Sequence, residues 1–248
     1  MRVRTMLLFF YLALSASGIA QQSVDRAAKQ PYSLSVTPKL HSAGHSPYSG
    51  TYFNHDLNLE VNITYKYRHV SAFITKYIDF VDTHSSVNFT TAGIFRSIQV
   101  NERLKVTPYV GYFFGQARSW MDKSSDMWTG LAIKWDLSEW LWVENTTLVG
   151  NLLHHNATTS LANRLNAGIM IGQFKLDAYT WYSHSMHTPF HFVSAGLGIT
   201  SPEWILSSSV SMKVQITVLQ QIADEKPNGT ITRGGFISLI VPVEWTNE

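Results

Sequence analysis

The sequence predicts an all-β fold, an antiparallel up-and-down transmembrane β-barrel of about 12 strands. Residues 57–67 place apolar side chains at odd positions and polar ones at even positions, which gives a strand one apolar and one polar face. Similar two-faced segments fill most of the chain after residue 20. Short and long connections alternate between these segments, as is typical of barrels that cross a membrane.

The chain begins with an export signal. Basic residues at Arg2 and Arg4 are followed by an apolar run over residues 6–14 and then by small residues. This pattern predicts a secretory signal peptide, residues 1–20, cleaved after Ala20, since the apolar run is far shorter than the roughly 20 residues of a membrane-spanning helix. Residues 21–248 are expected to form a single barrel domain.

The composition excludes several kinds of chemistry. The sequence has no cysteine, which rules out a lipid-modified N-terminal cysteine, disulfides, thiolate metal ligands and a cysteine nucleophile. The full chain has 19 Lys plus Arg against 17 Asp plus Glu, but Arg2 and Arg4 belong to the leader, so the mature chain is balanced in charge. Because it also lacks a long basic run, we expect no nucleic-acid partner.

No segment after the leader is apolar enough for a membrane-spanning helix. Hydrophobic residues make up 45% of the chain, and the longest apolar candidate, residues 236–245, is interrupted by Ser238 and Pro242. A membrane protein of this composition must cross the membrane as a barrel. Strands in which apolar and polar residues alternate have a low mean hydropathy, so they are not detected as apolar segments.

Each predicted strand has one face favoured by apolar residues. The alternation is weakest in residues 31–38, and it is clear in residues 104–115 and 204–216, where even positions are apolar, and in residues 162–172, where odd positions are. Helical spacing fits these stretches less well. In order, the predicted strands are residues 31–38, 57–67, 70–80, 87–100, 104–115, 127–136, 140–150, 162–172, 174–184, 190–200, 204–216 and 232–245.

Connection lengths predict the orientation and the strand number. Membrane barrels join strands by short turns on the periplasmic side and by longer loops outside. If residues 57–67 run toward a short turn, an upward strand must precede them, and residues 31–38 supply it; ten strands are the alternative if residues 21–68 fold differently. Short links are predicted at residues 68–69, 101–103, 137–139, 173 and 201–203, and longer ones at 81–86, 116–126, 151–161, 185–189 and 217–231.

Aromatic residues gather near the predicted strand ends. Trp and Tyr favour the boundary between lipid and water, where an apolar ring and a polar atom are both satisfied. The alternative is that these rings fill the core of a soluble β-sandwich; the signal peptide and the alternating connections favour the membrane. The clusters comprise Tyr65, Tyr67, Tyr112, Phe114, Trp135, Trp140, Trp142, Tyr179, Tyr182, Phe190, Phe192, Trp204 and Trp245.

The closing strand, residues 235–245, is similar to the aromatic-terminated last strand that the barrel-assembly machinery recognises. It departs from that pattern because three residues follow Trp245 and because Pro242 lacks a donor for the strand ladder. The chain thus resembles bacterial outer-membrane β-barrel proteins. This resemblance implies a location in the outer membrane of a Gram-negative-type bacterium, with outer-membrane lipid and the assembly machinery as partners. Members with about twelve strands include nucleoside channels and a phospholipase, but no diagnostic motif of either is present.

Side chains at alternate positions of a strand point to the same face, and this alternation predicts a lumen lined by charges of both signs. An open pore with this lining would be hydrophilic and not strongly ion-selective; the alternative is a closed lumen filled by paired charges. The side chains predicted to face the lumen are Glu60, Lys66, Arg96, Lys105, Lys134, Asp136, Glu144, Arg164, Lys175, Asp177 and Lys213.

Histidines near one predicted loop are the weak candidates for a site. His184, His187 and His191 have spacings that could converge on a metal, and His184 beside Ser185 could form a base and nucleophile pair. A loop does not fix such spacings, and no carboxylate in it would orient a histidine. We therefore expect solvated loop residues, no metal and no cofactor.

The first functional hypothesis is a passive channel or transporter for small solutes, with specificity set by the lumen charges and by residues 116–126 and 217–231. The second is a lipid-modifying outer-membrane enzyme that uses His184, Ser185 and His187. The third is a structural or surface-binding barrel with a plugged lumen, and a soluble β-sandwich or lipocalin-like carrier ranks below these. The pattern favours a protein that is not an enzyme.

Overall fold

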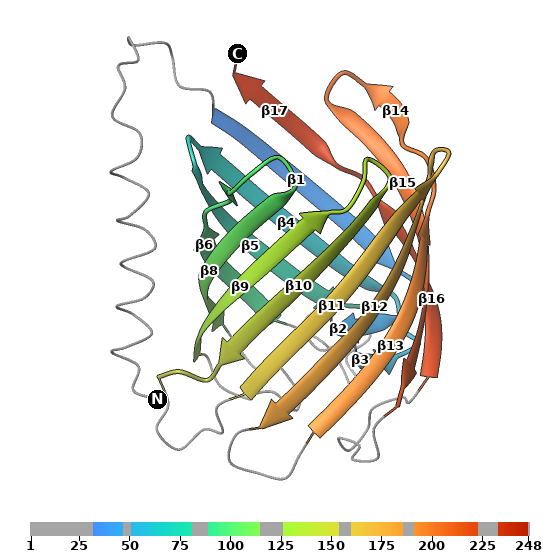
Figure 1. Cartoon of the computed structure of the whole chain (residues 1–248). Coiled ribbons are helices and arrows are strands. Elements are labelled where there is room, and N and C mark those ends of the chain that lie inside the picture. Colours follow the sequence, from blue (N-terminus) through green and yellow to red (C-terminus); the bar gives the residue numbers. More distant parts are fainter. Residues whose placement is uncertain are drawn as a thin grey trace.

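The computed structural model describes residues 32–46, 51–80, 89–114, 126–153, 160–185, 191–222 and 233–247. These residues form one 15-stranded antiparallel sheet and a separate two-stranded sheet, β2 with β3. The large sheet closes on itself, because β13 pairs with β15 and β1 pairs with both β4 and β16 (Figure 1). No described residue belongs to a helix, so no helix among them is long and apolar enough to cross a membrane.

The wall of the barrel has twelve strand positions, as the sequence predicts, because β6 with β7, β13 with β14, and β16 with β17 each share one position. The strands are β1 (Tyr32–His41), β2 (Gly44–Ser46), β3 (Thr51–Asn54), β4 (Asn58–Tyr67), β5 (Val70–Asp79), β6 (Phe89–Phe95), β7 (Ile98–Gln99), β8 (Leu104–Phe114), β9 (Asp126–Asp136), β10 (Leu141–Gly150), β11 (Ser160–Ile171), β12 (Phe174–Ser185), β13 (His191–Thr200), β14 (Trp204–Ser207), β15 (Val210–Gln221), β16 (Arg233–Ile240) and β17 (Val243–Asn247).

The first strand, which has the weakest sequence pattern, closes the ring. β1 pairs along its whole length with β4 and on its other side with β16 and β17. The ten-stranded alternative is therefore wrong. A transmembrane barrel needs this closure, because an unpaired strand edge would expose backbone groups to lipid.

The segment predicted as a single strand over residues 204–216 is a hairpin instead. β14 turns at residues 208–209 into β15, which continues to Gln221. Serine hydroxyls compete for backbone donors and so favour turns, and here the Ser209 amide donates to the Ser207 hydroxyl. The predicted short link at residues 201–203 is therefore wrong, and the reversal of the chain lies further on.

The pairing register gives the wall an apolar outside and a mainly polar inside. Outward side chains such as Leu197 and Ile237 are more than half exposed, whereas the inward Thr91 and Ser238 have no exposed surface. A soluble barrel would show the opposite arrangement. The exposed apolar wall is the surface that a membrane barrel turns to lipid.

The two ends of the barrel differ. Short turns gather at one end, at residues 68–69, 101–103, 137–140, 172–173 and 208–209, and this short-turn end is uppermost in Figure 1. Arg68 and Gly172 have φ of 55° and 60°, as tight two-residue hairpins require. The strands meet the longer connections at the opposite, long-connection end. Tyr32 and Asn247 are paired at the short-turn end.

Candidate functional site

The first connection, between β1 and β4, enters the lumen at Ala43. It carries the β2–β3 hairpin, which lies at the long-connection end of the barrel (Figure 1), where β3 contacts β15. Ala43 is only 2% exposed and packs with Trp181, Leu219 and Phe236, whose side chains belong to the inner face of the wall. This part of the connection therefore occupies space inside the barrel.

The lumen is filled at the long-connection end. The largest fully buried side chains of the described residues all lie on the inner face at this end, most of them close to a strand terminus. Burial of polar side chains without exposed surface means that close-packed protein occupies this part of the lumen. These side chains are Asn58, Tyr77, Thr91, Asp126, Ser183, Ser194 and Ser238.

Toward the short-turn end the lumen is hollow. A central cavity of about 380 Å³ is lined by residues of eight strands from β4 to β12, which only the inside of the barrel can provide. A second cavity of about 400 Å³ is lined by Lys66, Arg68 and other residues of the short-turn end. Thr64 and Phe95 line both cavities, so the two spaces adjoin; together they are called the passage, which extends from the short-turn end to the middle of the barrel.

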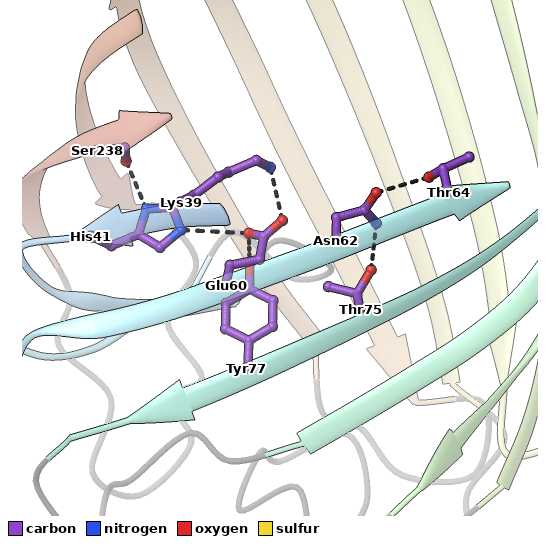
Figure 2. A network of polar contacts seen from close by, with 8 residues as sticks. All are labelled: Lys39, His41, Glu60, Asn62, Thr64, Thr75, Tyr77 and Ser238. Atoms are coloured by element: carbon purple, nitrogen blue, oxygen red, sulfur yellow. Dashed lines mark hydrogen bonds and ion pairs between the residues drawn. The ribbon is translucent and has the colours of Figure 1, made fainter. Parts of the chain in front are cut away.

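Glu60 holds together a network of side chains at the seam of the barrel (Figure 2). The Lys39 Nζ lies 2.8 Å from Glu60 Oε1, the Tyr77 hydroxyl donates to Oε2, and His41 Nε2 lies 3.5 Å from Oε2. On its other side, His41 Nδ1 is 2.7 Å from the Ser238 hydroxyl. The network joins β16, β1, β4 and β5, which are the strands where the ring closes.

The contacts from Ser238 through His41 to Glu60 have the order of a serine hydrolase triad. The Ser238 side chain has no exposed surface, so a substrate carbonyl has no route to its hydroxyl. A nucleophile must approach the reacting carbon within van der Waals distance. The network links β1 with β16, at the point where the ring closes.

A row of neutral polar side chains continues from this network into the central cavity (Figure 2). The Asn62 amide donates to the Thr75 hydroxyl at 2.7 Å, and its carbonyl accepts from the Thr64 hydroxyl at 2.9 Å. All three side chains line the central cavity. They give one side of the passage hydrogen-bonding groups without charge.

Most of the charged side chains on the inner face are paired. Arg164 Nη2 lies 2.8 Å from Glu144 Oε1, and the pairs Lys134–Asp136, Lys175–Asp177 and Lys213–Glu203 have N–O distances of 2.6, 3.0 and 3.2 Å. Such pairs give a lumen of mixed sign with little net charge.

The alternation of side chains in the sequence predicts that most of these residues face the lumen. Glu60 and Arg164 line the central cavity, and Lys66 lines the cavity at the short-turn end. Arg96 differs, because it lies between β6 and β7, next to the cavity residue Phe95. The register places the others on the face shared by the cavity residues, namely Lys105, Lys134, Asp136, Glu144, Lys175, Asp177 and Lys213.

Aromatic side chains line the lumen, which the sequence pattern did not predict. Five aromatic side chains border the central cavity, and ring centroids lie 6.1 Å apart for Phe73 and Phe95, and 5.5 Å apart for Phe95 and Tyr109. The signal was present in β5, where positions 71, 73, 75, 77 and 79 alternate hydroxyl or acidic residues with rings. The other two rings belong to Trp128 and Trp181.

The predicted histidine candidates lie only partly within the described residues. His184 is in β12, where its ring stacks on Tyr182 with centroids 6.2 Å apart, and it is the cross-strand partner of His191. His187 and the side chains of Ser185 and His191 lie outside the described part of the structure. Among the described residues, no group of His, Asp or Glu side chains could hold a metal ion. The expectation that His187 and His191 are solvated residues without a metal stays a prediction, whereas His184 lies in a strand and not in the loop.

No family model and no curated protein matches this sequence. Three solved structures resemble the barrel over 85–90% of this chain and 98–100% of their own. They are the NanC porin (8% identity, TM-score 0.56), the KdgM porin in complex with disordered oligogalacturonate (7%, 0.53) and an outer membrane channel from Pseudomonas putida F1 (10%, 0.53). At such identities the likeness shows the fold, which is that of bacterial outer-membrane β-barrels, as the sequence predicts.

Proposed function

We propose that the protein is a passive channel for small solutes in the outer membrane of a Gram-negative-type bacterium. The observation that carries this proposal is the passage formed by the two adjoining cavities, which begins at the short-turn end and reaches the middle of the barrel. Proteins described as porins and as a channel share the fold. Hydroxyl, amide and paired charged groups line the passage and would keep it wetted.

The first connection sets the width of the channel in this proposal. With the short turns in the periplasm, the β2–β3 hairpin lies toward the cell exterior, at the end where the lumen is filled. Ala43 and its contacts with Trp181 and Phe236 hold the connection against the inner wall. The connection narrows the lumen at this end, so it would set the size limit for solutes.

Planar-bilayer recording tests the proposal. Replacing Gly44–Asn54 by a short Gly/Ser linker should raise single-channel conductance at least about twofold, because the space at the narrow end grows. The matched control is Leu197→Ala on the outer wall, which leaves the lumen unchanged. Each variant is first shown to be folded by its heat-dependent migration in SDS gels. Equal conductance of wild type and hairpin variant would contradict the role of the first connection.

The filled long-connection end also favours a second candidate, a barrel with a closed lumen that serves a structural or surface-binding role. The same recordings separate the two candidates. Wild-type protein that never conducts, together with a hairpin variant that does, would identify a plugged barrel. A wild-type protein that conducts identifies a channel.

A further inference from the structure

We propose that the central cavity is a binding site for a neutral mono- or disaccharide. This inference rests on the channel function proposed above, and it names the class of solute. The aromatic rings, the neutral polar row and the pairing of the charges each argue for this class.

The rings provide flat apolar surface inside a polar passage. Phe73, Phe95 and Tyr109 come from neighbouring wall strands and are each partly exposed. Water and small ions gain nothing from such surface, whereas the C–H groups on the face of a pyranose ring carry partial positive charge and are attracted to the negative face of an aromatic ring. Phe95 lines both cavities, so a sugar moving along the passage would meet this ring.

Hydrogen-bonding groups lie on the same cavity wall. Asn62, Thr64 and Thr75 line it together with the three rings, and Thr146 lines it from β10. Small-molecule sites combine apolar walls with a few well-placed polar groups. A saccharide has this division, with hydroxyl groups at its edge and C–H groups on its faces. A purely aromatic solute would leave the polar row unused.

Charge pairing argues for a neutral ligand. The central cavity has two charged side chains in its lining, Glu60 and Arg164. Glu60 is paired with Lys39, and Arg164 with Glu144, each at 2.8 Å. An anionic sugar would have to compete with Glu144 for the guanidinium. The site thus differs from one that would suit an acidic ligand. The oligogalacturonate present with the KdgM porin is such a ligand.

The volume also fits this class. At about 380 Å³ the cavity lies at the small end of the range for ligand pockets, roughly 300 to 1,000 Å³. It would hold one or two sugar rings, with longer chains continuing toward the short-turn end.

The test measures how sugars block the ion current through the mature protein in planar bilayers. Maltose and glucose should each reduce the current saturably. Sorbitol, which has hydroxyl groups like those of glucose but no ring, should not block at the same concentration, and neither should glucuronate, which keeps the ring and adds a negative charge. Phenol serves as the probe for a purely aromatic solute.

Phe95→Leu keeps an apolar side chain but removes the flat ring, and it should raise the half-blocking concentration of maltose about tenfold. Phe174→Leu is the matched control, because Phe174 lies on the outer wall and is 47% exposed; its half-blocking concentration should equal that of the wild type. Both variants are first checked for heat-dependent gel migration.

The outcomes separate this inference from the channel proposal. Conduction without saturable maltose block, or block by glucuronate or phenol at concentrations as low as those of maltose, overturns the saccharide site and leaves the channel intact. Equal maltose block of wild type and Phe95→Leu also overturns it. If the protein does not conduct, maltose binding is followed by intrinsic tryptophan fluorescence, to which Trp128 and Trp181 at the border of the cavity contribute. A saturable change then supports the site although the channel proposal has failed, and no change overturns both.

Discussion

At the scale of single residues, polar groups are stabilised in different ways on the inner and outer faces of the wall. On the inner face, Glu60 is 6% exposed and accepts from Lys39 and Tyr77 while His41 lies beside it. A buried carboxylate needs such partners, because burial removes its water. The first and last strands meet at this network, so its loss should weaken barrel closure.

Glu60→Ala is expected to lower the free energy of unfolding by about 3 kcal/mol, since it removes a buried acceptor that Lys39 and Tyr77 share. Urea titration of the protein folded in lipid vesicles measures this change. The control is Asp136→Ala, which breaks the Lys134–Asp136 pair of side chains that are 27% and 38% exposed and should cost less than about 1 kcal/mol. Equal losses in the two variants would show that the seam network adds no particular stability.

The outer wall holds an unusual polar pair. The side-chain amides of Asn145 and Asn163 donate to each other's carbonyl oxygens at 3.1 Å, and Asn163 also donates to Thr147 at 2.7 Å. The register places Asn145 beside Ile133 and Leu165, which are 42% and 46% exposed on the outer wall. The pair satisfies polar groups that would otherwise face lipid alone.

A double-mutant cycle with Leu at both positions tests the pair. Each single replacement should destabilise the barrel, because it removes a hydrogen-bond partner of the amide that remains in lipid, whereas the double replacement should recover most of the loss. We expect a coupling free energy of about 1 kcal/mol in unfolding experiments in vesicles. Additive losses would mean that the two amides are not paired in the membrane.

The sequence predicted residue positions where side-chain parity was strict. Glu60 and Arg164 were assigned to the lumen because their flanking neighbours are mostly apolar, and both line the central cavity. Phe73 and Phe95 were missed, because an apolar ring gives the same signal on either face of a wall. Only the register, which pairs Phe73 with Thr64 and Gly93, decides on which side the rings lie.

At the scale of elements, alternation located the strands better than it located their ends. It extended through residues 204–216, since the parity of β14 continues across the turn into β15 and the turn itself leaves no gap in the pattern. The predicted strand over residues 87–100 is likewise broken into β6 and β7. Local side-chain hydrogen bonds, such as that between Ser209 and Ser207, decide where a strand turns, and hydropathy does not report them.

Inward glycines let aromatic side chains lie flat against neighbouring strands. A Cβ atom at Gly111 would lie 2.5 Å from the Trp128 ring and 2.8 Å from the Ala92 carbonyl oxygen. Because one of these atoms belongs to the backbone, the clash is not relieved by moving a side chain alone. This glycine therefore fixes how β6, β8 and β9 pack together.

Gly111→Ala is expected to lower the free energy of unfolding by about 1 to 3 kcal/mol, the usual cost of overpacking. Gly198→Ala is the matched control on the same inner face, since its added Cβ would have no atom closer than 3.5 Å. Its stability should stay within about 0.5 kcal/mol of wild type, as for substitutions without a steric cause. Similar stability of both variants would show that Trp128 does not pack on Gly111.

At the scale of the whole molecule, the barrel has a defined boundary at its short-turn end. Exposed aromatic residues gather there on the outer wall, among them Trp135, Trp140 and Trp245, each about half exposed. Such a belt marks the interface between lipid and water. Because aromatic side chains also line the lumen, composition alone could not separate the belt from the cavity wall.

Closure is the property on which the whole molecule depends, and β1 provides it. Deleting residues 32–41 would remove the pairing partner of β4, β16 and β17 at once. Each backbone group left unpaired in lipid costs several kcal/mol, so the remaining strands cannot stay inserted as an open sheet. The truncated protein should lose both heat-dependent gel migration and recovery in the membrane fraction. Replacing the β2–β3 hairpin by a linker should preserve both, because that hairpin belongs to a separate sheet. A truncated chain that still migrates as a folded barrel would mean that the ring closes without its first strand.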